Sequence, residues 1–247
     1  MMNYLWKHKS NISLKDKTPF IYTDIHSHLL PAIDDGAKTY EESIALIKRF
    51  VALGYKKIIT TPHIMSDYYR NTPEIIHSKL QKLRNKIKEQ HIDIEIDAAA
   101  EYYIDEWFIN QVNTQKPLLT FGDRFLLVET SFMSKPYLFF DTLFKLQAQG
   151  YKPILAHPER YTYLQNDFEL VESIHQKKIL LQINLNSLDG YYGKAAQKLA
   201  EKLIDKAMIQ FAGSDCHGNR HLDSLQKVQK KKYYLKLKKL ALINHQL

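Results

Sequence analysis

From about residue 20 onward, the chain alternates between short apolar runs and longer amphipathic stretches. The short run at residues 57–61 is rich in β-branched residues. Residues 125–128 form a continuous apolar run, as in a strand that is covered on both faces. Ahead of these runs, Thr39 and Glu42 form a capping-box pair, and the apolar residues that follow recur at helical spacing. The pattern therefore predicts strands that alternate with helices.

We expect seven strand–helix units, with no break in composition between them, although a clear helical pattern does not follow every strand. We expect strands at residues 19–24, 57–61, 92–101, 125–128, 153–156, 179–183 and 209–212, and helices at about residues 39–54, 72–87, 137–149, 168–176 and 194–207. Strand–helix alternation favours a parallel sheet. The predicted fold is a single α/β domain, a distorted (β/α)7 TIM-like barrel over residues 21–247, preceded by an N-terminal extension over residues 1–20.

The composition is that of an ordinary globular protein. Of the 247 residues, 45% are hydrophobic and 25% are charged, enough apolar surface for a large core. No run has the roughly 18 uncharged apolar residues that a membrane span requires, and residues 1–20 contain no apolar stretch of the kind found in a signal peptide, so we expect no secretory signal. The single cysteine forms no intrachain disulfide, so we expect a cytoplasmic protein.

The formal net charge of +8 favours anionic partners, and much of the excess lies near the C-terminus. The lysines there are Lys227, Lys230, Lys231, Lys232, Lys236, Lys238 and Lys239. Apolar residues alternate with them at amphipathic spacing, which indicates a solvated face of a C-terminal helix. Nucleic-acid binding is the less favoured reading of this segment.

Side chains that can bind metals follow almost every predicted strand. His26 and His28 leave the first strand on the same face, because side chains alternate along a strand. Such a pair alone is a weak signal. The corresponding residues after later strands are His63, Glu101, Glu129, His157, Asn184, Asn186, Asp215 and His217. The carboxyl ends of barrel strands meet at one mouth, so the sequence predicts one polar site there.

Imidazole and carboxylate ligands suit Mn, Fe or Zn, and there are enough of them for more than one ion. Neighbouring metal ions activate water and hold the oxygens of an in-line displacement, which favours phosphate-ester hydrolysis. Asp34 and Asp35 precede Gly36 in a segment that can return to the mouth. Turn formation explains this pair as well, and either carboxylate could be the ligand.

Together these residues resemble the PHP (polymerase and histidinol phosphatase) superfamily, and within it the metal-dependent bacterial protein-tyrosine phosphatases of capsule and exopolysaccharide operons. The resemblance covers about residues 23–220. The motifs that carry it are Asp24-Ile25-His26-Ser27-His28, Asp34-Asp35-Gly36, Thr61-Pro62-His63, Ala100-Glu101-Tyr102-Tyr103, Ala156-His157-Pro158-Glu159-Arg160-Tyr161 and Ser214-Asp215-Cys216-His217.

The resemblance implies a PHP fold with three divalent metal ions, usually Mn, with Fe or Zn as alternatives. It assigns the first ion to His26, His28, Glu101 and Asp215, the second to Glu101, Glu129 and His157, and the third to Asp35, His63 and His217. Arg160 is expected to bind the phosphate group, and Arg220 is the candidate for the family's second arginine at the site. Tyr102 and Tyr161 are the expected substrate contacts.

The predicted function is hydrolysis of phosphotyrosine on protein, by attack of a metal-bridging hydroxide. The family link implies that the partner is a bacterial tyrosine kinase of polysaccharide synthesis or export, dephosphorylated on its Tyr-rich tail. The alternatives are a small-molecule phosphatase of the histidinol phosphate type and, less favoured, a nucleic-acid-binding or nuclease-like protein.

A cysteine-dependent mechanism does not fit the sequence. In cysteine-dependent phosphatases an arginine stands six residues after the nucleophile, and here that position is Leu222. We therefore expect Cys216 to pack as a small apolar side chain.

Overall fold

The computed structural model describes residues 20–247, so the expected N-terminal extension, except for Phe20, lies outside the described residues. Short strands follow one another along this part of the chain. They are β1 (Thr23–Asp24), β2 (Lys57–Thr60), β3 (His63–Ile64), β4 (Glu95–Ala98), β5 (Glu101–Tyr103), β6 (Phe125–Glu129), β7 (Lys152–Ala156), β8 (Leu180–Asn184) and β9 (Phe211–Gly213).

All the strand pairs are parallel, in the orders β1-β2-β4 and β3-β5-β6-β7-β8-β9. The two sheets continue into each other, because β3 follows β2 and β5 follows β4. Across these breaks, Ala99 N donates to Thr60 O at 3.0 Å and Glu101 N donates to Pro62 O at 3.1 Å. The expected strand over residues 92–101 is therefore in two pieces, and each broken strand occupies one of seven positions.

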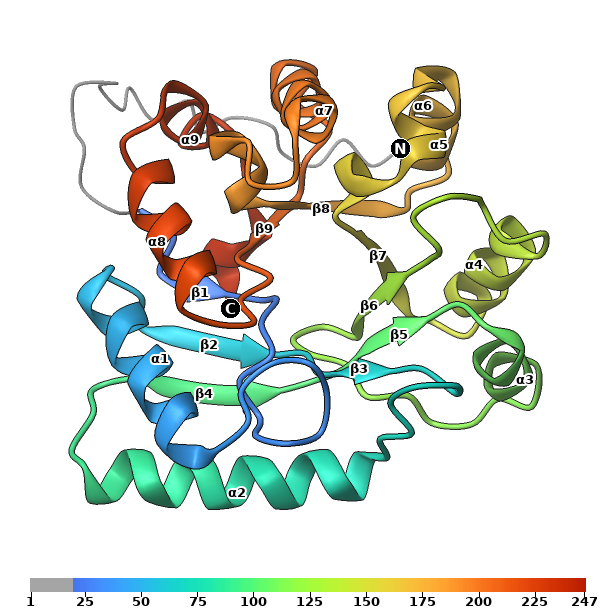
Figure 1. Cartoon of the computed structure of the whole chain (residues 1–247). Helices are drawn as coiled ribbons and strands as arrows, with labels where there is room; N and C mark the ends of the chain where they lie inside the picture. The colour runs from blue at the N-terminus through green and yellow to red at the C-terminus, as the bar shows by residue number, and fades with distance from the viewer. Residues whose placement is uncertain (1–19) are drawn as a thin grey trace, which may run out of the picture.

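The ring of strands closes between its first and last positions. Asp215 N donates to His26 O at 2.7 Å, and His28 N donates to Cys216 O at 2.9 Å. The predicted distorted (β/α)7 barrel is thereby confirmed, and Figure 1 shows the helices arranged around the strands.

The α-helices of the described chain are α1 (Tyr40–Ala52), α2 (Pro73–Glu89), α3 (Glu106–Asn113), α4 (Phe139–Ala148), α5 (Thr162–Gln165), α6 (Phe168–Gln176), α7 (Lys194–Asp205), α8 (Asn219–Val228) and α9 (Lys232–Leu237). Single 3-10 turns are η1 (Pro158–Arg160), η2 (Leu185–Asp189) and η3 (Ile243–Gln246). None of the helices within residues 20–247 is long and apolar enough to cross a membrane.

Three helical segments differ from the prediction. The sequence pattern missed the short helix α5 and also α3, where Asp105 caps the first turn by accepting a hydrogen bond from Phe108 N. The lysine-rich C-terminal segment is not one helix but two, α8 and α9. Lys231 and Lys236 in this segment pair with Asp189 and Asp205, so part of its charge is locally compensated.

Two apolar layers lie on either side of the strands. The larger layer packs the outer faces of the strands against the helices. The smaller one draws its members from the strands and the adjoining segments, not from the α-helices, so it fills the inside of the ring. Its strand residues include Ile59, Leu127, Ile154 and Phe211.

Strand β6 shows how this packing orients the mouth of the barrel. Phe125 and Leu127 belong to the inner layer, whereas Leu126 and Val128 belong to the outer one. Alternation then directs Glu129, the last residue of the strand, to the inner side. A carboxylate is thus placed at the end of the ring, directly above its apolar filling.

Candidate metal centre

Nine side chains converge at the carboxyl ends of the strands, and we call them the ligand cluster. They are His26, His28, Asp35, His63, Glu101, Glu129, His157, Asp215 and His217, the residues that the resemblance assigned to the metal ions. Glu101 lies at the middle. Its Oε2 atom is 3.1 Å from His26 Nε2, 3.1 Å from His63 Nδ1 and 3.5 Å from His28 Nε2.

The ligand cluster divides into overlapping groups, and the ligand atoms within each group lie within 4.8 Å of one another. The groups are His28, Asp35, His63 and His217; His26, His28 and Glu101; His26, His157 and Asp215; and His63, Glu101 and Glu129. His63 therefore stands between two groups, where the resemblance assigned it to the third metal ion alone. Such sharing of ligand atoms between groups fits a site that holds several neighbouring metal ions.

The polar atoms at the centre of the ligand cluster fit bound cations. His26 Nε2, His28 Nε2, His63 Nδ1 and Glu101 Oε2 are buried, and none of them has a hydrogen-bond partner among the described residues. Buried polar atoms without partners are costly, and here they face one another. Divalent ions bound by imidazole and carboxylate would satisfy them, so the residues present fit the implied metal ions.

The structure separates the roles of the two neighbouring aspartates. Asp35 Oδ1 lies 3.5 Å from His63 Nε2 and 3.2 Å from His217 Nε2, inside the ligand cluster. Asp34 lies behind the cluster, where its Oδ2 accepts a hydrogen bond from His28 Nδ1 at 2.8 Å and its Oδ1 accepts one from Gly36 N. Asp34 thus fixes the imidazole that leaves Nε2 facing the centre.

Gln182 fixes the imidazole of His26 in the same way that Asp34 fixes that of His28, and the sequence pattern did not predict this role for Gln182. Its Oε1 atom accepts a hydrogen bond from His26 Nδ1 at 2.8 Å, which directs Nε2 toward the centre. The available signal was a polar residue within the apolar strand β8, because a buried glutamine in a strand must find partners.

The two oxygens of Asp215 serve different neighbours. Oδ1 lies 3.4 Å from His26 Nε2 and 3.4 Å from His28 Nε2. Oδ2 accepts hydrogen bonds from Arg160 Nη1 at 2.7 Å and from Asn184 Nδ2 at 2.6 Å, and a longer one from Tyr192 Oη at 3.4 Å. Asp215 adopts a left-handed backbone conformation with φ of 50°, a strained geometry that is typical of functional sites.

The electrostatics of the ligand cluster keep its carboxylates ionised. Burial favours the neutral form of Glu101, but His26 and His63 hold its pKa well below the usual range. Burial likewise opposes the charge of Asp215, whose pKa is also held well below its usual range, chiefly by His26. Burial lowers the pKa of His26, but Glu101 and Asp215 outweigh it and raise the pKa to about 9. Ionised carboxylates are the state that binds metal ions.

The two expected arginines are placed differently. Arg160 borders the ligand cluster through its hydrogen bond to Asp215. Arg220 is exposed at the start of α8 and forms no hydrogen bond or ion pair within residues 20–247. The ring of His221, the next residue, lies 5.5 Å from that of His217, so α8 presents an imidazole rather than a guanidinium to the ligand cluster.

The burial of Tyr102 and Tyr161 contradicts the expected substrate contacts. Tyr102 is 2% exposed, and its hydroxyl accepts a hydrogen bond from Leu119 N. Tyr161 is fully buried, and its hydroxyl accepts one from Thr130 N. Both rings belong to the outer apolar layer, so no substrate can reach them.

Cys216 is buried in the same apolar layer, as expected. Burial raises the pKa of its thiol, which keeps it protonated and unreactive.

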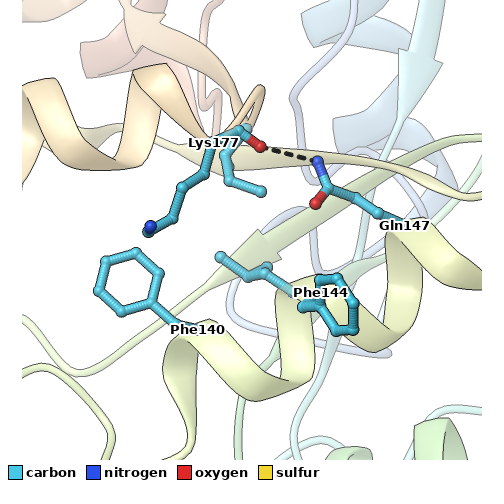
Figure 2. Close-up of a pocket in the computed structure, with 6 residues that line it drawn as sticks. Phe140, Phe144, Gln147 and Lys177 are labelled. Carbon is cyan, nitrogen blue, oxygen red and sulfur yellow. Dashed lines mark hydrogen bonds between the residues drawn. The ribbon is translucent and has the colours of Figure 1, made fainter.

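An apolar hollow on the outer wall of the barrel is separate from the ligand cluster. Phe140, Phe144, Gln147 and Lys177 are among the residues that line it, between α4 and the turn that leads into β8 (Figure 2). Gln147 Nε2 donates to Lys177 O at 3.0 Å there. With no carboxylate or imidazole in its lining, this hollow offers no hydrolytic chemistry.

The family model for capsular polysaccharide synthesis proteins of the CpsB/CapC type matches residues 22–244. The chain belongs to the CpsB/CapC family. A putative tyrosine-protein phosphatase CapC from Staphylococcus aureus is 31% identical over 194 residues, 78% of this chain and 76% of the relative. Tyrosine-protein phosphatase YwqE from Bacillus subtilis is 31% identical over 195 residues, with the same coverage of both chains.

Solved structures agree with this fold. A crystal structure from work on YwqE of Bacillus subtilis and CpsB of Streptococcus pneumoniae, described as metal-dependent tyrosine phosphatases, matches with a TM-score of 0.77 at 27% identity. The match covers 89% of this chain and 96% of the solved one. A histidinol phosphate phosphatase from Lactococcus lactis matches with a TM-score of 0.53 at 14% identity, over 85% and 92% of the two chains, which shows a shared fold alone.

Proposed function

We propose that this chain is a metal-dependent phosphatase that hydrolyses phosphotyrosine on protein. The observation that supports it most is the ligand cluster, whose unpaired atoms meet at one point of the barrel mouth. Membership of the CpsB/CapC family, which includes named tyrosine-protein phosphatases, supports the choice of substrate. The proposal includes three divalent ions, with Mn as the expected metal and Fe or Zn as alternatives.

Under this proposal the ions are held as the resemblance assigns them, with His63 close enough to serve two groups. Bound metal ions would supply activation of water and neutralisation of phosphate charge. The chain contributes the rest: Gln182 and Asp34 orient His26 and His28, and Arg160 presents its guanidinium beside Asp215. A guanidinium at this place binds phosphoryl oxygens and stabilises the charge that develops on them.

The surface around the mouth suits an aromatic phosphoester on a protein. Tyr68 and Tyr191 lie on loops that follow strands, and both are exposed. They replace Tyr102 and Tyr161 as the candidates for stacking against a tyrosyl ring. We further propose that the substrate is a bacterial tyrosine kinase of polysaccharide synthesis or export, and that the enzyme acts in the cytoplasm.

The test compares substrates and ligand variants with Mn²⁺ present. Wild-type protein should hydrolyse a phosphotyrosyl peptide and a simple aryl phosphate, and should act poorly on histidinol phosphate. His26→Ala and Glu101→Ala should lose at least about 10²–10³ in turnover, the scale for removing one main electrostatic stabiliser. Elemental analysis of the purified protein should find divalent metal.

Cys216→Ser is the matched control, since a metal-dependent reaction leaves it fully active. Full activity of Glu101→Ala, or preference for histidinol phosphate, would overturn the proposal.

A further inference from the structure

The guanidinium of Arg160 lies against two aromatic rings. Its Cζ atom is 4.5 Å from the centre of the Phe132 ring and 4.3 Å from that of the Tyr192 ring. Nη1 donates to Asp215 Oδ2, and no second hydrogen bond of the guanidinium is formed within residues 20–247. The remaining N–H donors are therefore available to a ligand, and the side chain is 23% exposed.

The order of the strands explains how the two rings reach the same guanidinium. Arg160 follows β7, Phe132 follows β6 and Tyr192 follows β8, and β7 pairs with β6 and β8. Each ring thus comes from the loop of a neighbouring strand. We call Phe132 and Tyr192 the aromatic clamp.

Both residues of the aromatic clamp are themselves held in place. The carbonyl of Phe132 accepts hydrogen bonds from Thr162 N at 2.8 Å and Thr162 Oγ1 at 2.9 Å, which joins the loop after β6 to the loop after β7. Tyr192 stands between Gly190 and Gly193, whose φ angles of 80° and 93° define a turn that favours glycine. Tyr192 Oη also donates to Asp215 Oδ2 at 3.4 Å. Contacts other than those with Arg160 therefore help to hold both residues of the clamp.

We infer that Phe132 and Tyr192 are positioning residues that hold the Arg160 guanidinium with its free edge toward the phosphoryl group of the substrate. This inference rests on the proposed function. A free arginine side chain loses much rotamer freedom when it binds phosphate. Two aromatic faces that attract the cation, together with Asp215, impose that order before the substrate arrives.

The test removes each ring and measures phosphate affinity directly, by calorimetry of inorganic phosphate with the Mn²⁺-loaded protein. Phe132→Leu and Tyr192→Leu should each weaken phosphate binding about three- to tenfold, the range for losing a cation–π contact of this kind. KM for an aryl phosphate should rise in parallel. Tyr192→Phe keeps the ring and loses only the long 3.4 Å hydrogen bond from the hydroxyl to Asp215 Oδ2, so it should bind phosphate like the wild type. Phe132→Trp keeps an aromatic face and should also bind phosphate like the wild type.

The same substitutions made in an Arg160→Ala background distinguish a positioning role from a general structural one. In an Arg160→Ala background, Phe132→Leu and Tyr192→Leu should change phosphate affinity by less than about twofold, because their effect passes through the guanidinium. Phe144→Leu, the same chemical change on the outer wall, is the control and should have no effect. Metal content by elemental analysis should be equal in all variants.

Unchanged phosphate affinity in Phe132→Leu, or an equal loss with and without Arg160, would overturn the inference. Because the Phe132 side chain is 39% exposed, we expect Phe132→Leu to fold even if Tyr192→Leu does not. If the wild type binds phosphate but fails to hydrolyse phosphotyrosyl peptides, the proposed function fails while the binding measurements still decide the role of the clamp.

Discussion

Gln182→Met tests how strongly the scaffold behind the ligand cluster controls metal binding. Gln182 is fully buried, and its Oε1 atom accepts the hydrogen bond from His26 Nδ1 at 2.8 Å. Its Nε2 atom donates to Asn184 Oδ1 at 3.0 Å, and Asn184 Nδ2 donates to Asp215 Oδ2 at 2.6 Å. The Gln182 amide therefore connects His26 directly, and Asp215 through Asn184, within one hydrogen-bond network. Methionine fills a similar space but forms neither of the two hydrogen bonds made by the amide.

The size of the effect follows from these contacts. Removing a group that orients a metal-bound histidine costs about 10–100-fold in metal affinity, or about 1.4–2.8 kcal/mol. The substitution also leaves His26 Nδ1 and Asn184 Oδ1 buried without these partners, at about 1–3 kcal/mol for each group. The metal-free variant should therefore also unfold at lower temperature than the metal-free wild type.

The assay is activity on an aryl phosphate as a function of free Mn²⁺, with metal affinity measured by competition with a chelator. Gln182→Met should need about 10–100-fold more Mn²⁺ for half-maximal activity and should approach wild-type turnover at saturation. Gln147→Met removes a glutamine hydrogen bond on the outer wall and is the matched control. Wild-type metal dependence in Gln182→Met, or activity that no metal concentration restores, would refute the reasoning.

Three further predictions concern the surroundings of the ligand cluster. Gly36→Ala should lower the free energy of unfolding by at least about 2 kcal/mol in denaturant, because the new Cβ would lie 2.0 Å from His28 O. A Cβ at Gly218 would meet no atom within 4 Å among residues 20–247 apart from its chain neighbours, so Gly218→Ala should be neutral, and equal stability of the two variants would contradict this. Cys216 should react with a thiol reagent only after unfolding, as followed by mass spectrometry, since it is fully buried; rapid labelling of native protein would count against the described burial. Removal of metal by a chelator should lower the melting temperature, and added Mn²⁺ should restore it in a concentration-dependent way. A melting temperature that does not change with metal concentration would contradict metal binding by the ligand cluster in the folded state.

The sequence predicted more of the site than of its surroundings. Period-two alternation and the ends of seven strands pointed to the members of the ligand cluster, as Glu129 shows by following Phe125 and Leu127 on the inner face. The same reasoning missed Gln182, and it placed Tyr102 and Tyr161 at the substrate. A loop residue after a strand can face the mouth or the helices, and local pattern does not distinguish the two.

The chain by itself determined the number of strand positions in the barrel and the chemistry at their ends, because both depend on residues that are close in sequence. Only the tertiary structure decided which aspartate enters the ligand cluster, that Arg220 stays outside it, and that Phe132 and Tyr192 meet at Arg160. These outcomes depend on contacts between loops of different strands, which form only when the ring closes. Their partners are separated by many residues, so no local pattern of hydrophobic and polar positions carries the information.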